Sequence, residues 1–209
     1  MPAHPPVRPC VRGRRGSAMI ELALALTIAF PLLLGVGAIG IRLSRTLQAT
    51  QLTRDVAHMY ALGADFSLAG TQAIARTLSR DYNLSATGRA VLMFSRIAKI
   101  QQLDCDAAGL HTCPNLNLPV FTQRIVMGNP AQRTSQFGTP PPAYIGSGGD
   151  IAAVDYCQRS ALVATGFNAL LTLNPGQSTT LVEGYFAMPD INFLNLPSSG
   201  GGYYVRFLF

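Results

Sequence analysis

The chain has 209 residues, of which 48% are hydrophobic and 12% are charged, and its formal net charge is +6 at pH 7. Four of its sixteen basic residues precede Gly16, so the rest of the chain carries twelve basic and ten acidic residues and has little excess charge. No stripe of basic and aromatic residues follows, so the composition argues against nucleic acid as a partner and favours one membrane segment joined to one globular domain.

The first predicted element is a membrane-spanning helix. Leu22–Ile41 contains twenty residues without a charge, and at about 1.5 Å per residue such a helix spans roughly 30 Å, the thickness of a bilayer core. The run is longer than the apolar region of a secretory signal, and it leads into a helical pattern instead of a cleavage loop. Arg42 and Arg45 follow the run, but four arginines precede it, so the positive-inside rule places the N-terminus in the cytoplasm.

Glu21 lies one residue before the uncharged run. A carboxylate at the centre of a spanning helix costs about 2.5–3.5 kcal/mol on the insertion scale, and the cost is smaller near the helix end, where the group reaches the headgroups. One interpretation is therefore an interfacial glutamate that the helix dipole favours.

The residues around Glu21 support a second interpretation, because their order resembles that of type IV pilin-like prepilins. A basic leader is followed by Gly16, the small residue Ser17, Glu21 as the fifth residue after the glycine, and about twenty apolar residues. The resemblance implies that a membrane aspartyl prepilin peptidase cuts between Gly16 and Ser17 on the cytoplasmic side. The new amine of Ser17 then lies about one helical turn from the carboxylate of Glu21, which neutralises it or pairs with a neighbouring subunit's amine. The leader residues nearest the glycine are Arg12, Arg14 and Arg15.

Within that class, residues 12–66 resemble the TadE-like minor pseudopilins of the Flp/Tad (type IVb) pilus system. The shared layout is basic residues, glycine, small residues, glutamate, an apolar helix with a proline, and a polar helix that ends here in "TRDVAHMYALG", Thr53–Gly63. Leu22 departs from the major Flp pilins, which usually carry an aromatic residue there, and this chain is far longer. The resemblance therefore indicates a minor component, with prepilin peptidase, other Tad pilins and pseudopilins, the inner-membrane assembly platform and the lipid bilayer as partners.

The function that this resemblance implies is assembly of a Tad-type pilus for surface adhesion. The protein is expected as a single-pass protein of the bacterial inner membrane, with its C-terminal domain extracytoplasmic, and in the extracellular pilus after assembly. Two alternatives stay open. One is an uncut single-pass membrane protein with an extracytoplasmic binding domain, and the other is a type II secretion pseudopilin, which shares the leader.

Beyond Ile41 the helical period continues, which predicts one helix from about Ala18 to Leu62, with a bend near Pro31. A second, amphipathic helix is expected to begin at Ala69 or Thr71 and to extend to Tyr82, with Thr71 as a candidate N-cap and Ile74, Leu78 and Tyr82 on one face. Gly128–Asp150 predicts a long loop rich in proline and glycine, and Ser160–Leu173 fits a helix or a strand. Apolar runs bounded by turn residues predict four strands, Arg89–Ile100, Val120–Met127, Thr179–Met188 and Tyr203–Phe209.

These elements predict an α+β fold, in which a long N-terminal membrane and stalk helix is followed by a small antiparallel-sheet domain with one or two further helices. The expected division is a basic prepilin leader at 1–16, the transmembrane and stalk helix at 17–65, and the extracytoplasmic α+β domain at 66–209.

The sequence assembles no catalytic set, so we expect neither an enzyme nor a cofactor. Cys105 and Cys113 are eight residues apart in a loop-like stretch, and in an oxidising compartment they are candidates for a disulfide. The alternative is two free thiols, and Cys157 is expected as a buried thiol. His111 lies between Cys105 and Cys113, but three ligands at this spacing do not make a zinc motif, so no metal site is predicted.

Overall fold

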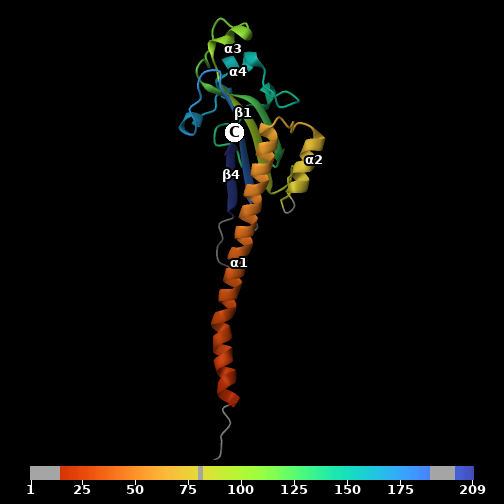
Figure 1. Cartoon of the computed structure of the whole chain (residues 1–209), viewed down its shortest axis with the longest axis vertical. Helices are drawn as coiled ribbons and strands as arrows, with labels where there is room; N and C mark the ends of the chain where they lie inside the picture. Colours follow the sequence, from red (N-terminus) through yellow and green to blue (C-terminus); the bar gives the residue numbers. More distant parts are fainter. Residues whose placement is uncertain (1–14, 80–81, 189–200) are drawn as a thin grey trace, which may run out of the picture. The chain divides into compact units, whose positions relative to one another are not determined.

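The computed structural model describes residues 15–79, 82–188 and 201–209, with side chains from Ala18 onward (Figure 1). The chain divides into two compact units, Met1–Ser44 and Arg45–Phe209. The α+β class predicted from the sequence is confirmed, because a long apolar helix is followed by a four-stranded antiparallel sheet and a few short helices.

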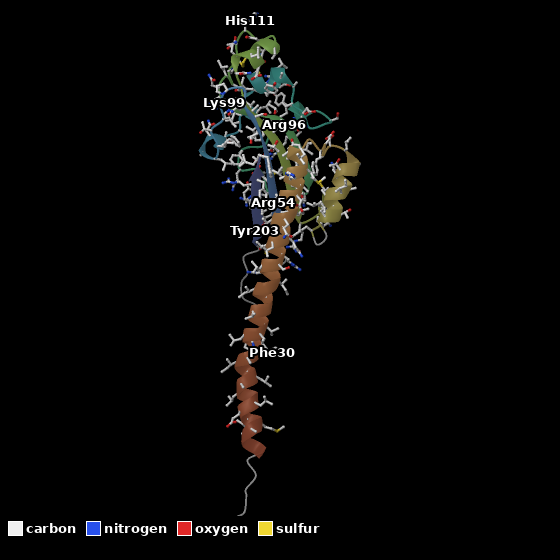
Figure 2. The ribbon with its side chains drawn as sticks, in the orientation of Figure 1. Phe30, Arg54, Arg96, Lys99, His111 and Tyr203 are labelled. Atoms are coloured by element: carbon white, nitrogen blue, oxygen red, sulfur yellow. A yellow bond between two sulfur atoms is a disulfide. The ribbon has the colours of Figure 1, made fainter. Side chains whose placement is uncertain are left out.

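The described part of the first unit is helical and belongs to α1, Arg15–Ala61. Its large apolar side chains are exposed on all sides, and Figure 2 shows Phe30 projecting away from the helix axis. The helix continues through Pro31, whose nitrogen has no hydrogen to donate to the preceding turn. By length and composition α1 can cross a membrane, and its apolar stretch is not buried within protein.

The second unit is built on one sheet with the strand order β2-β1-β3-β4, and all neighbouring strands are antiparallel. The register of β1 and β2 shifts between Arg96 and Ile97, where the ladder contains an irregularity. The strands begin and end within about two residues of the predicted bounds. They are β1 Ala90–Lys99, β2 Pro119–Gly128, β3 Ser178–Ala187 and β4 Gly202–Leu208.

One face of this sheet is covered by the last turns of α1. Leu52, Val56 and Tyr60 of the helix are buried against apolar residues of β1 and β3, among them Phe94. A β-carbon added at Gly184 of β3 would lie 2.6 Å from the Thr53 hydroxyl oxygen, so the missing side chain lets the helix approach the strand closely. These contacts begin at Ala49. The second compact unit starts within α1, at Arg45.

The opposite face of the sheet is covered by irregular segments. Phe137, Leu162 and Phe167 from three such segments pack against Phe121 and Leu181 of the strands. Ser160–Leu173, which fitted either a helix or a strand, holds two short 3-10 turns. The short helical elements of this part are α3 Gln102–Ala107, α4 Ala153–Gln158, and the 3-10 turns η1 Pro142–Tyr144, η2 Ser160–Leu162 and η3 Phe167–Ala169.

The helix α2, Ala69–Leu78, begins at the first of its two expected starts, but it ends before Tyr82 and its orientation differs from the prediction. It begins after Leu68, which makes no side-chain cap, so the expected N-cap role of Thr71 is wrong. Ile74 and Leu78, predicted on its apolar face, are 52% and 44% exposed, and Ala75 is the buried residue. Ala75 belongs to the same core cluster as Phe66 and Phe94, whose ring centroids are 4.2 Å apart. Because Phe66 occupies the space beside the sheet, α2 turns a small side chain toward the core.

Candidate functional site

The predicted processing site lies at the N-terminal end of α1. Arg12 and Arg14 lie outside the described residues, whereas Arg15 is the first residue of the helix. Gly16 and Ser17 follow in its first turn. The cut expected between them therefore falls where backbone N–H groups have no intrahelical partner, and little helix must unwind to present the bond.

Glu21 lies on the same helix, four residues after Ser17, and it is exposed. Four residues correspond to about 6 Å of helix axis and place the two positions on neighbouring turns of one face. An amine created at Ser17 and the carboxylate of Glu21 therefore fit the pairing that the sequence pattern predicts. The 20 residues that follow Glu21 carry no charge.

A buried polar network, which the sequence analysis missed, lies between the sheet and the loop after β2. Glu183 of β3 is fully buried and accepts hydrogen bonds from the Tyr204 hydroxyl at 2.6 Å, the Gln136 backbone N–H at 3.1 Å and the Ser135 hydroxyl. Its carboxylate also lies 3.8 Å from the guanidinium of Arg124 on β2. The carboxylate is thus held by four groups from three separate segments of the chain.

Arg124 is buried as well, and its environment is only partly polar. Its Nη1 donates to the Ser95 hydroxyl oxygen at 2.5 Å, and its Nη2 lies 3.3 Å from the Met93 sulfur. The Nε atom has no hydrogen-bond partner among the described residues. Burial lowers the pKa of Arg124, and the neighbouring Glu183 carboxylate opposes this effect.

Tyr204 completes the network as a neutral donor. Burial raises the pKa of the Tyr204 hydroxyl above its ordinary value, and the hydrogen bond to Glu183 raises this pKa further. The Arg133 guanidinium lies over the Tyr204 ring, 4.6 Å from the ring centroid. Each of these groups contacts at least one other member of the network. We therefore infer that the network holds the loop that follows β2, which contains Ser135 and Gln136, against the sheet.

The sequence carries one signal for this network. Arg124 and Glu183 are each a charged residue within an apolar strand prediction, and a charge at such a position either faces solvent or needs a buried partner. The partners Ser135 and Tyr204 come from a loop and from the last strand, at separations of 48 and 21 residues from Glu183. Periodicity within one strand does not identify contacts of that kind.

Three cysteines of the described residues form the second cluster. Cys105 of α3 and Cys113 form a disulfide, and the buried thiol of Cys157 on α4 lies close by, with all three sulfurs within 4.8 Å of one another. Figure 1 shows α3 and α4 side by side. The label of His111 in Figure 2 lies at the outer tip of this region, and the histidine is not part of the group. Burial, followed by the charge of Asp104, raises the pKa of the Cys157 thiol, which favours its neutral form.

We expect removal of the disulfide to destabilise the second unit by about 2–3 kcal/mol, because an eight-residue loop then regains its freedom in the unfolded chain. Both cysteines are replaced together, as Cys105→Ser with Cys113→Ser, because Cys157 is near enough to pair with a single remaining thiol. Thermal unfolding followed by near-ultraviolet circular dichroism measures the change. Cys157→Ala is the control, with a smaller loss, and an unchanged Tm in the double variant would contradict the prediction.

No family model, curated protein or solved structure matches the chain.

Proposed function

We propose that the protein is a TadE-like minor pseudopilin of a Tad-type pilus. In this proposal it is inserted in the bacterial inner membrane with its N-terminus in the cytoplasm and its sheet domain outside. A prepilin peptidase cuts it after Gly16, and the assembly platform then incorporates it at low copy among other pilins and pseudopilins. The pilus in turn serves adhesion to surfaces.

The observation that carries the proposal is the position of Gly16, Ser17 and Glu21 at the start of a helix with exposed apolar side chains. A plain membrane anchor needs none of these three residues in that order. A helix that remains on the mature protein and packs against neighbouring helices needs a cut on the cytoplasmic side and a partner for the carboxylate. The continuation of α1 to Ala61 also supports the proposal, because it joins the apolar segment to the sheet domain without a cleavage loop.

Glu21 has a defined role in this proposal. Within the hydrocarbon of the membrane or in the apolar centre of a filament, its charge is costly unless a cation lies beside it. The cation is the amine that cleavage creates at Ser17, on the same chain or on a neighbouring subunit. When the carboxylate of one subunit pairs with the amine of its neighbour, the pairing fixes the axial position of the two subunits relative to each other. Because only a cleaved subunit has this amine, the pairing also selects processed subunits.

Glu21→Ala is therefore expected to leave membrane insertion and cleavage intact and to remove the protein from the pilus. The measurement compares the membrane fraction with pili sheared from the cell surface in a strain that makes a Tad pilus, using an epitope tag after Phe209. We expect at least a tenfold loss from the sheared fraction, which corresponds to about 1.4 kcal/mol. Asp55→Ala removes an exposed carboxylate further along the same helix and is the matched control. Equal amounts of Glu21→Ala and wild-type protein in the pili would contradict the role of Glu21.

A further inference from the structure

Two arginines of the second unit line one cleft. The cleft has a volume of about 290 Å³, and Arg45 of α1 and Arg89, the residue before β1, both contribute to its wall. Arg45 is half-buried and Arg89 is exposed. The two ion pairs among the described residues join Arg124 to Glu183 and Arg159 to Asp155, so neither arginine of the cleft has a carboxylate partner there.

The rest of the wall is fixed in position and offers further donors. The Tyr82 hydroxyl donates to the backbone carbonyl oxygen of Arg45 at 2.7 Å, and the Tyr82 ring lies 4.6 Å from the Phe186 ring. Asn83 and Thr87 also line the cleft, and their amide and hydroxyl groups can donate to a phosphate oxygen.

The turn between Asn83 and Arg89 holds these groups in place. The Ser85 backbone N–H donates to Asn83 Oδ1, and the Gly88 backbone N–H donates to the Ser85 carbonyl oxygen, each at 2.9 Å. A β-carbon at Gly88 would lie 2.0 Å from the Asn83 carbonyl oxygen, so this close turn requires glycine. Arg89 donates to the Met188 carbonyl oxygen at 3.3 Å, which uses one of its five N–H donors and leaves the others for a ligand.

The position of Arg45 in the chain points to the ligand. It is the fourth residue after the uncharged run that ends at Ile41, and four residues of helix rise about 6 Å. If Leu22–Ile41 fills the hydrocarbon core, Arg45 lies at the level of the headgroups on the outer side. An arginine at that level opposes the positive-inside pattern, and a negatively charged ligand in the cleft accounts for Arg45.

We propose that Arg45 and Arg89 form a binding site for the headgroup phosphate of an anionic phospholipid in the outer leaflet. Guanidinium groups bind phosphate oxygens through paired, charge-assisted hydrogen bonds. Arg89 is brought to the cleft by the strand and not by the helix, so the site exists only in the folded domain. The inference rests on the membrane-spanning part of the proposed function, and it depends on neither cleavage nor assembly.

The test measures lipid retention by native mass spectrometry on the purified full chain in detergent, with the leader still attached. The probe is dioleoylphosphatidylglycerol, and dioleoylglycerol is the control, because it has the same acyl chains and no phosphate. We expect the wild type to retain the phospholipid and not the diacylglycerol. Arg45→Ala and Arg89→Ala are each expected to lower retention about tenfold, as loss of a charge-assisted contact does.

Two further arginines serve as controls for the surface charge. Arg54→Ala removes an exposed arginine further along α1, and Arg42→Ala removes one nearer the membrane, and both are expected to retain the lipid within about twofold of the wild type. Equal losses in Arg42→Ala and Arg89→Ala would overturn the proposal, because the attraction would then be diffuse. Inorganic phosphate bound as strongly as the phospholipid would overturn the choice of a lipid. Unchanged retention in Arg45→Ala and Arg89→Ala, with near-ultraviolet spectra like that of the wild type, would overturn the site itself.

Discussion

Replacing Glu183 by alanine is expected to destabilise the second unit by about 3–5 kcal/mol, because the change leaves a buried guanidinium without its carboxylate. Arg124 has no other ion-pair partner among the described residues, and its Nε atom already lacks a hydrogen bond. The Tyr204 and Ser135 hydroxyls and the Gln136 backbone N–H also lose their acceptor. In a domain of this size the Tm should fall by about 10 °C.

The measurement is thermal unfolding of the full chain in detergent, followed by the near-ultraviolet circular dichroism of tyrosine, since the chain contains no tryptophan. Glu183→Gln keeps acceptor capacity and removes the charge, so its loss should be smaller. Asp155→Ala is the matched control. It removes the half-buried carboxylate of the other ion pair, whose partner Arg159 is exposed, and should cost at most about 1 kcal/mol.

A second variant tests whether the loss comes from the unpaired charge. Arg124→Met combined with Glu183→Leu replaces both partners by apolar side chains, and it should recover much of the stability that Glu183→Ala loses. If Glu183→Ala were as stable as the wild type, the network would not hold the loop after β2, and our interpretation of it would be wrong.

Replacing Gly16 by leucine is expected to lower prepilin peptidase cleavage by at least about tenfold, or about 1.4 kcal/mol in the activation free energy. The peptidase must bring its catalytic groups to the carbonyl of residue 16, and a glycine leaves the backbone free to approach and to leave the helical conformation. The site lies in the first turn of α1, and the terminal turns of a helix unfold more readily than its middle. Co-expression with a prepilin peptidase and analysis of the membrane fraction by intact mass measures the cut fraction.

Gly13→Leu is the matched control for this variant. Gly13 also lies among the leader arginines, three residues upstream of Gly16. The Gly13→Leu variant should be cut like the wild type, because the proposed site is defined by its distance from Glu21. The presence of another glycine in the leader does not define it. Full cleavage of Gly16→Leu would contradict the proposed cut site.

Much of the fold could be predicted from the sequence, because its strands are mainly apolar segments with clear turn residues between them. Val120–Met127 was predicted and β2 is Pro119–Gly128, and β1, β3 and β4 agree with their predictions equally well. Segments of this kind have clear ends, because turn residues bound them. One example is "LNPGQ", Leu173–Gln177, which directly precedes β3. The length of α1 was also predicted, since its helical period extends from the apolar run to Ala61.

Tertiary contacts decided the features that the sequence did not predict. The period of α2 identified an apolar stripe with Ile74 and Leu78, but the packing of Phe66 against the sheet turned the helix so that Ala75 faces inward. Arg124 and Glu183 were missed because their partners lie in other segments. The processing site was predicted from the local order of residues alone, and both the site and its role stay predictions.

The most direct test of the proposed function is the first residue of the mature protein, determined by mass spectrometry of the N-terminal peptide from the membranes of cells that make the pilus. The proposal predicts that Ser17 is the first residue and that the peptide before it, which carries Arg12, Arg14 and Arg15, is absent. A protein that keeps its leader in those membranes would contradict the pseudopilin proposal and would favour an uncut membrane anchor.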